Sequence, residues 1–356
     1  MGIGLAQGRR LVAAVRHRVA DVARAYAGSP TGFDRRVTES DVRAAFRLVL
    51  GRAPDADGLH TYRAMVGRAD VSELVGCLLS SEEFRRSKLH DIAARREHED
   101  LVDVTTAEGL RFGVSLHDIL NRPLRDGGEY EPHVAAAMDE VVRPGMTVCC
   151  VGANIGFHAL RAARAVGHAG SVFAFEARPE NAAAVLQNAA RSGLSNVVVF
   201  PFAVADAVAL YRYVRAQGTN GYIEPIAPLV DGDRELADAR LVQAIPLDLV
   251  APSMGRIDLL QLDVEGAEGL VLRGARRLLA GSPRPVIMSE LCLGQLERTS
   301  QISGEEFLRT VVDLGYRLEV LRYADEPLPY GRDAAGLAQY ARSQPTSQID
   351  IRCLPE

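Results

Sequence analysis

From about residue 99 to the C-terminus, short apolar segments alternate with helical segments, and this alternation constrains the fold more than any other feature. Apolar runs such as Val148–Val151 and Val172–Phe175 are each followed by a stretch with helical character. Strands that alternate with helices predict a parallel, doubly wound sheet. Two late apolar segments, Tyr316–Leu321 and Gln348–Leu354, are expected to pair antiparallel at the sheet edge. The sequence therefore predicts an α/β fold with a mostly parallel sheet and an antiparallel edge strand.

The first strand of this sheet ends in a loop suited to a cofactor. It reads VCCVGANIG over Val148–Gly156, where Gly152 and Gly156 bracket Asn154. Glycine permits positive φ and a close backbone approach, and Asn tolerates the left-handed region better than most residues. Glu176 ends the second strand, where a carboxylate accepts hydrogen bonds from a ribose diol. Together they predict a dinucleotide or S-adenosyl cofactor.

Two features of the chain distinguish between these cofactors. The dinucleotide fingerprint G-x-G-x-x-G is absent, because the loop reads G-A-N-I-G and is followed by the bulky Phe157. Three carboxylates, Asp263, Glu265 and Glu268, cluster where the fourth strand turns into a helix. They would repel a pyrophosphate, but they suit a cationic sulfonium group and a hydroxyl that must lose its proton. The pattern favours S-adenosylmethionine.

Several phrases of the chain resemble the FkbM-type family of S-adenosylmethionine-dependent methyltransferases. They are VRPGMTVCCVGANIGFHAL, VFAFEARPENAAAVLQNAA, NVVVFPFAVAD, and DLLQLDVEGAEGLVLRGARRLL with PVIMSEL. The resemblance implies a Rossmann-like methyltransferase sheet and methyl transfer to a hydroxyl oxygen of a sugar or natural product. It also implies that the cofactor loop is formed by Gly152, Asn154 and Gly156. Glu176 would contact the ribose, Asp206 would lie near the adenine, and Glu131 would belong to a segment over the cofactor.

Two positions depart from the family's usual pattern. The family normally has Asp where this chain has Cys150, and that carboxylate helps to hold the methionine end of the cofactor. It often has Lys where this chain has Gln261. Because burial raises the pKa of a thiol, Cys150 is expected to be an uncharged cofactor-loop residue, not a catalytic one. Loss of one charged hydrogen bond is expected to weaken cofactor binding by about 1.5–3 kcal/mol.

Methyl transfer to a hydroxyl requires positioning and removal of a proton. Asp263, at the carboxyl end of the fourth strand, is the first candidate for the base, and a helix cap is its alternative role. Glu265 and His133 are the further candidates. Asp263 and Glu290 would also suit Mg²⁺, but this is the less favoured alternative, and no metal ligand is predicted.

Two segments precede the α/β domain, which is predicted over residues 99–356. Residues 1–30 form a predicted basic amphipathic helix, suited to a protein partner, to an anionic membrane surface or to packing on its own protein. Residues 38–92 form a predicted small helical docking module that opens on capping side chains at Thr38. Its phrase LGRAPDADGL resembles a helical domain of undefined function that accompanies bacterial surface-glycan enzymes. A hairpin is expected over Val102–Val114.

The composition excludes several classes of protein. With 356 residues, 47% of them hydrophobic, the chain is long enough for two domains with full cores. A net charge of -5 argues against a dedicated nucleic-acid binder, and no apolar run approaches the length that spans a bilayer. Five cysteines without a C-x-x-C pair suit reduced thiols. We therefore expect a cytoplasmic protein, or one peripheral to the inner membrane.

Three functions remain open at this point. The leading one is an O-methyltransferase that acts on a hydroxyl of a glycan, glycolipid or natural-product acceptor. The alternative, suggested by Cys150 and the N-terminal module, is a non-catalytic scaffold in a glycan-assembly complex. A nucleotide-dependent oxidoreductase is disfavoured by the glycine spacing.

Overall fold

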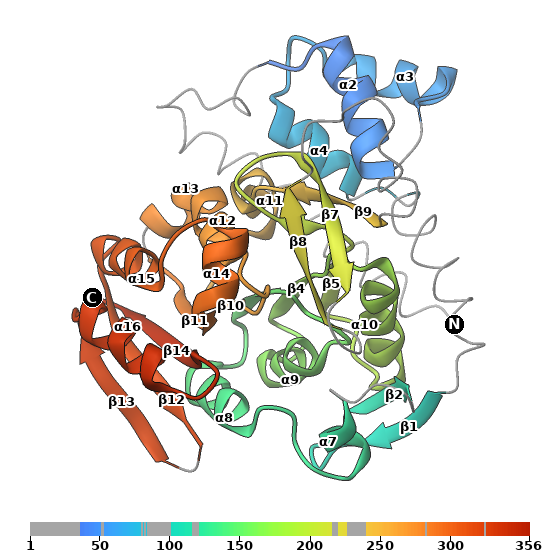
Figure 1. Cartoon of the computed structure of the whole chain (residues 1–356). Helices are drawn as coiled ribbons and strands as arrows, with labels where there is room; N and C mark the ends of the chain where they lie inside the picture. The colour runs from blue at the N-terminus through green and yellow to red at the C-terminus, as the bar shows by residue number, and fades with distance from the viewer. Residues whose placement is uncertain are drawn as a thin grey trace, which may run out of the picture. The chain divides into compact units, whose positions relative to one another are not determined.

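The computed structural model describes residues 36–50, 53–79, 81, 83, 101–115, 121–215, 220–225, 240–281, 283–323 and 325–356 (Figure 1). The basic helix predicted over residues 1–30 lies outside these ranges. The chain divides into two compact units, one comprising Met1–Asp91 with Leu247–Arg256 and the other comprising Ile92–Pro246 with Ile257–Glu356. Among the helices described, none has the length and apolar character needed to cross a bilayer.

The first unit is helical, as the sequence predicts. Thr38 caps its first helix, because the hydroxyl accepts from the Asp41 amide and the Asp41 side chain accepts from the Thr38 amide. The segment Leu247–Met254, which the sequence places inside the α/β domain, forms helix α11 of this unit and contacts α4. Its other elements among the described residues are α2 (Glu39–Ala45), the π-helix η1 (Phe46–Leu50), α3 (Ala56–Arg63) and α4 (Val71–Leu79).

The second unit is built on an eight-stranded sheet with the order β13-β12-β14-β11-β10-β3-β4-β5. The strands from β11 to β5 are parallel, and their side chains are largely buried, as expected for strands covered on both faces. These five strands are β3 (Thr147–Val151), β4 (Ser171–Phe175), β5 (Val197–Phe200), β10 (Leu259–Leu262) and β11 (Val286–Cys292). The mostly parallel, doubly wound sheet is therefore confirmed.

The antiparallel edge of the sheet is confirmed and is wider than predicted. Strand β14 (Gln348–Pro355) pairs antiparallel with both β11 and β12 (Tyr316–Arg322). A further strand, β13 (Asp325–Gly331), pairs with β12 and forms the edge, and helix α16 (Ala334–Ser343) follows it. Neither β13 nor α16 is predicted from the sequence.

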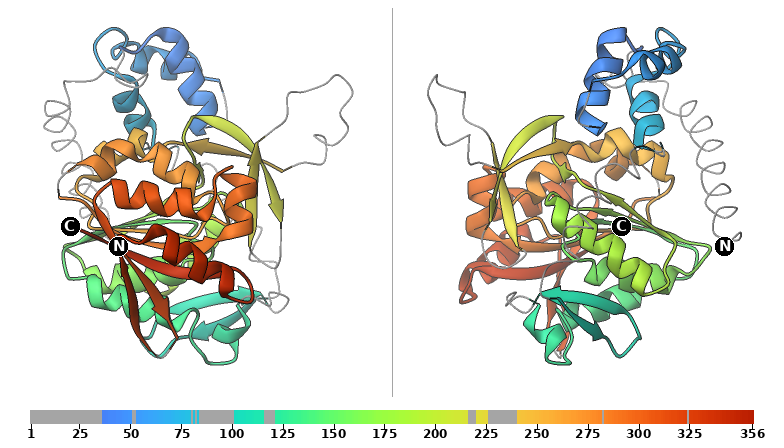
Figure 2. Two further views of the ribbon diagram at one scale, coloured as in Figure 1. Left: turned by 60° about the vertical axis from the view of Figure 1, so that its left-hand side comes forward. Right: turned by 90° about the vertical axis from the view of Figure 1, so that its right-hand side faces the viewer.

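Helices cover both faces of the sheet. Figure 2 shows α9 and α10 on one face and α12, α14 and α15 on the other. The segment predicted as one helix after the fourth strand is two helices, α12 and α13, which meet at Ala275. The helices of this unit are α7 (Arg122–Arg125), α8 (Pro132–Val141), α9 (Phe157–Val166), α10 (Pro179–Arg191), α12 (Glu268–Gly274), α13 (Arg276–Ala280), α14 (Leu293–Thr299) and α15 (Gly304–Asp313).

Two smaller sheets accompany the main one. The predicted hairpin is present as β1 (Leu101–Thr105) and β2 (Arg111–Ser115), with Gly109 at positive φ in its turn. A four-stranded sheet with the order β6-β9-β7-β8 is not predicted. It comprises β6 (Ala203–Val204), β7 (Ala209–Arg215), β8 (Gly221–Pro225) and β9 (Arg240–Ile245), and its buried side chains pack on Ala267 and Leu270.

Candidate functional site

The loop after β3 lies where the sequence places it, at the carboxyl end of the first parallel strand. Gly152, Asn154 and Gly156 all have positive φ, at 85°, 49° and 100°. A Cβ atom at Gly152 would meet the backbone oxygen of Asp263, so glycine is required by the close approach of the β10 turn. Gly156 begins helix α9, and a Cβ atom there would crowd Leu160.

Glu176 connects this loop to the end of β4 by hydrogen bonds. One carboxylate oxygen accepts a hydrogen bond from the Asn154 amide and the other from the Arg178 amide, each at 2.8 Å. The side chain is buried, and burial raises the pKa of Glu176 to about 7 despite these two donors. Glu176 therefore has two roles, since it fixes the loop and presents a carboxylate to the adjacent pocket.

That pocket opens at the carboxyl ends of β3, β4 and β10. Gly152, Asn154 and Glu176 line it together with Asp263 and Glu265. The structure thus brings five of the predicted site residues to one cavity. Its apolar lining comes from the segments after β4 and β5 and from the small sheet, and it includes Ala177, Phe202, Ala203, Tyr213, Tyr222 and Ile223.

The small sheet also contributes Asn220, a pocket residue that the sequence does not single out. Its amide nitrogen donates to Glu265 at 2.6 Å, and its amide oxygen accepts from the Asn154 side chain at 2.7 Å. Asn220 therefore links the glycine loop to the carboxylates after β10. The Asn220-Gly221 pair beside a strand is a hairpin signal that would have marked this segment.

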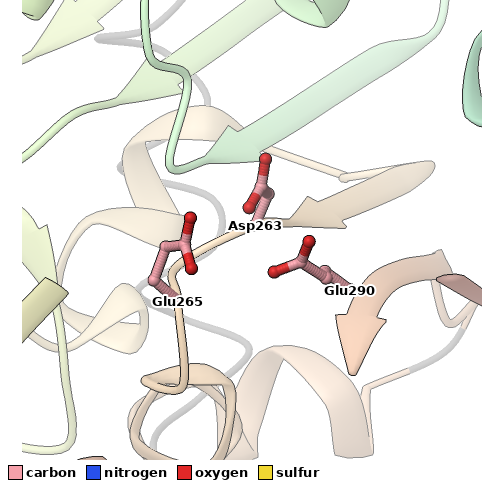
Figure 3. Close-up of side chains that lie close together, drawn as sticks. All are labelled: Asp263, Glu265 and Glu290. Atoms are coloured by element: carbon pink, nitrogen blue, oxygen red, sulfur yellow. The ribbon is translucent and has the colours of Figure 1, made fainter. Parts of the chain in front are cut away.

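Three carboxylates converge beside this pocket (Figure 3). Asp263 follows β10, Glu265 lies two residues further on at φ 53°, and Glu290 lies in the neighbouring parallel strand β11. Burial and the nearby charges of Glu131 and Glu265 raise the pKa of Asp263 well above its usual value. Burial, followed by the charge of Asp263, does the same to the pKa of Glu290.

A second pocket adjoins the first, and both are lined by Asp263. Its other acidic lining residues are Glu131, Glu290 and Asp350. Glu131 interacts with His158 at 2.8 Å, and Asp350 interacts with His133 at 2.6 Å. Burial alone would raise the pKa of Glu131, but the hydrogen bond and charge of His158 outweigh it and lower that pKa. Asp263, the candidate base, is therefore accessible from two adjoining pockets.

The structure does not bring every predicted residue to a pocket. His133 lines neither cavity, because its ring lies against Tyr323 while one nitrogen is held by Asp350. Asp206, predicted near the adenine position, instead pairs with Arg273 at 3.0 Å. Asp206 does not line the first pocket, whereas Phe202 and Ala203, which precede it in the chain, do.

Cys150 is fully buried within β3 and lines neither pocket. Burial raises the pKa of its thiol to about 12, so Cys150 is uncharged, as expected from the sequence. Its partner in the register between β3 and β10 is Gln261, which is also buried. The two departures from the family pattern are therefore neighbours. Their family counterparts, Asp and Lys, have opposite charges, and both are replaced here by neutral side chains.

Residues 151–318 match the family model of the methyltransferase FkbM domain. This part of the chain is therefore an FkbM-type methyltransferase domain, and the resemblance is confirmed over these residues. No curated protein matches the chain in sequence.

Three similar solved structures have low sequence identity to this chain. A SAM-dependent O-methyltransferase from Thermotoga maritima is 14% identical, with 72% of this chain and 93% of that chain covered and a TM-score of 0.37. M. jannaschii TYW2 in complex with AdoMet is 11% identical, with coverages of 72% and 85% and a TM-score of 0.37. A precorrin-6y C5,15-methyltransferase from Geobacter metallireducens GS-15 is 11% identical, with coverages of 64% and 89% and a TM-score of 0.36. Likeness at this level carries no argument about the site.

Proposed function

We propose that this protein transfers a methyl group from S-adenosylmethionine to a hydroxyl oxygen of a glycan, glycolipid or natural-product acceptor. The observation that carries the proposal is the pocket between Glu176 and Asp263. At one end, a buried carboxylate faces the cavity beside a glycine loop. At the other end lie carboxylates with raised pKa values, which suit removal of a proton.

The hydrogen-bond acceptors, negative charges and apolar surface of the pocket fit S-adenosylmethionine. Glu176 has oxygens placed to accept from a ribose diol, and Phe202 and Ala203 offer an apolar surface for a purine ring. Asp263 and Glu265 give the opposite end a negative charge that complements a sulfonium and an amino group. Neither Lys nor Arg is among the described residues that line this pocket, which disfavours a pyrophosphate.

When bound, the cofactor would supply an electrophilic methyl group, whose bond to sulfur breaks so that a neutral thioether is the leaving group. Asp263 borders both pockets, so an acceptor in the second pocket brings its hydroxyl within reach of this carboxylate. Ionised Asp263 takes the hydroxyl proton as the oxygen forms its new bond to carbon. A carboxylate with a raised pKa is a stronger base than an exposed one with an ordinary pKa. His133 would act only indirectly, by holding Asp350.

The neutral pair of Cys150 and Gln261 is compatible with a stable fold both in an active enzyme and in the alternative, a non-catalytic scaffold. Loss of one charge alone would leave an unpaired buried ion, whereas joint replacement leaves none. Docking through residues 38–92, and contact of residues 1–30 with a partner or an anionic membrane, remain predictions.

The proposal is tested by incubation with S-adenosylmethionine carrying a labelled methyl group and a panel of hydroxylated glycans and natural products. We expect label in an acceptor that survives alkaline hydrolysis, because methyl ethers resist base whereas methyl esters do not. The Asp263→Asn variant is the matched control and should incorporate at least about a hundredfold less label. Label that is lost in base, or that appears equally with Asp263→Asn, would overturn the proposed chemistry.

A further inference from the structure

The carboxylates of Asp263, Glu265 and Glu290 form a compact cluster. One oxygen of each lies within 4.8 Å of the others, and Figure 3 shows the three groups pointing toward a common space. Two of these residues are placed by neighbouring parallel strands, since Asp263 follows β10 and Glu290 lies near the end of β11. The sheet itself therefore sets the geometry of the cluster.

The negative charge of this cluster is not balanced by Lys or Arg side chains among the described residues of the two adjoining pockets. The nearest polar partners are neutral amides, because Asn220 donates to Glu265 and the Gln348 side chain donates to one oxygen of Glu290. Three carboxylates at this spacing repel one another strongly unless a proton or a cation lies between them.

A second observation concerns buried oxygens within and beside the cluster, and it also points to a ligand. The Oε2 oxygen of Glu290 is buried and accepts no hydrogen bond. Gln295, whose side chain hydrogen-bonds Glu265, likewise has a buried amide oxygen without a partner. The carboxylate of Glu268 accepts from the Val264 and Gly266 amides through one oxygen, and its other oxygen is also buried and unpartnered. Buried oxygens normally have a partner, so these three unpartnered oxygens indicate a place where a hydrogen-bond donor or a cation binds.

We propose that Asp263, Glu265 and Glu290 bind a divalent cation of the Mg²⁺, Mn²⁺ or Ca²⁺ class. Oxygen ligands at about 2.0–2.6 Å from such an ion lie at most about 4–5 Å apart across it. The observed spacing fits that range for the larger ions and needs an adjustment of a few tenths of an ångström for Mg²⁺. A soft metal is disfavoured, because the cluster offers oxygen and no sulfur or imidazole ligand.

Such an ion would have coordination positions left for water or for acceptor oxygens. Three carboxylates contribute three ligands, whereas these ions take six or more. The ion would border the second pocket, through Asp263 and Glu290, and would there bind and acidify a hydroxyl group. With the ion bound, Asp263 would hold the metal and would not take the hydroxyl proton directly. This catalytic role rests on the proposed methyl transfer, but binding of the cation does not.

The test is therefore a binding measurement without cofactor or acceptor. The full-length protein is treated with a chelator and dialysed, and Mn²⁺ is titrated while free Mn²⁺ is followed by electron paramagnetic resonance. Mg²⁺ and Ca²⁺ are titrated in competition. We expect one saturable site per chain, and at least a tenfold loss of Mn²⁺ affinity in Glu290→Gln. This variant removes one charge and keeps an oxygen that accepts from Gln348.

Glu297→Gln is the matched control, because it removes an exposed carboxylate of helix α14. It should bind Mn²⁺ as the wild type does. The melting temperature of the wild type should rise with Mn²⁺, and Glu290→Gln should lose that rise while it stays folded. The absence of saturable binding, or equal binding by wild type and Glu290→Gln, would overturn the site. Binding of S-adenosylmethionine, measured separately, should be unchanged in Glu290→Gln, since Glu290 does not line the first pocket.

Discussion

Substitution of Glu176 tests the cofactor end of the pocket most sharply. The two oxygens of this carboxylate accept from the Asn154 and Arg178 amides, both at 2.8 Å, and face the pocket. Glu176→Ala leaves two amides without a partner and removes the acceptors for the ribose. We expect a loss of about 2–4 kcal/mol in the free energy of unfolding, and a loss of about 1.5–3 kcal/mol in binding, which is roughly ten- to a hundredfold in Kd.

Glu176→Gln separates these two effects. Its amide oxygen keeps one acceptor, whereas its amide nitrogen opposes the second backbone donor. We expect an intermediate loss of stability, about 1–2 kcal/mol, with cofactor affinity nearly as weak as in Glu176→Ala. Urea unfolding measures the first quantity and isothermal titration calorimetry with S-adenosylmethionine measures the second.

The raised pKa of Glu176, about 7, adds a pH dependence with a definite sign. The folded protein retains a proton here that the unfolded chain loses near pH 4.5, so this group's contribution to stability falls as pH rises from about 4.5 to 7. Binding follows the opposite course, because only the ionised group accepts from both ribose hydroxyls. We expect about a tenfold gain in wild-type affinity between pH 6 and pH 8, and little change in Glu176→Gln. Equal affinities for the two proteins, or equal pH slopes, would refute the assignment of Glu176 to the ribose.

Three further predictions concern the rest of the site. Asp263→Asn should keep its fold and bind S-adenosylmethionine with an affinity within about threefold of wild type. Its single-turnover methyl transfer should be at least about a hundredfold slower. Normal turnover would make Asp263 a structural residue. Cys150→Asp should lower the free energy of unfolding, measured by urea titration, by about 3 kcal/mol or more. The double variant Cys150→Asp with Gln261→Lys should recover at least half of that loss. Additive losses in the double variant would show that the two side chains do not interact. Asn220→Ala should weaken cofactor binding about three- to tenfold in calorimetry, because it uncouples Asn154 from Glu265; wild-type affinity would place the cofactor away from the small sheet.

Much of the site could be predicted because its residues follow strands of one parallel sheet. Gly152, Glu176 and Asp263 each come directly after an apolar strand, and the carboxyl ends of parallel strands meet at one edge. Local sequence alone therefore places these residues together, and the pocket that they line is where this reasoning expects it.

Other parts of the site depend on contacts that sequence spacing does not encode. Cys150 and Gln261 are more than a hundred residues apart, and only the register of β3 and β10 shows that they are partners. Asn220 precedes a strand of a separate small sheet, whose packing against the glycine loop has no signal in the chain. Asp206 was expected in the pocket by position along the chain, but its ion pair with Arg273 holds it elsewhere.

Three residues other than glycine that line the two pockets have strained backbones. Glu131, Asn154 and Glu265 adopt positive φ, and each lines one of the two pockets. Such conformations cost of order 1 kcal/mol or more for residues other than glycine, and they tend to persist at functional sites. Of these three, only Asn154 carries a signal in the sequence, because Asn tolerates this region of φ and ψ.

The central claim is that the pocket between Glu176 and Asp263 binds S-adenosylmethionine. Isothermal titration calorimetry at pH 8, with S-adenosylmethionine and NAD titrated in turn into wild-type protein and Glu176→Ala, tests it most directly. We expect one S-adenosylmethionine per chain, an affinity at least tenfold weaker in Glu176→Ala, and no binding of NAD. Binding of NAD but not of S-adenosylmethionine, or S-adenosylmethionine binding that is unchanged in Glu176→Ala, would contradict the claim.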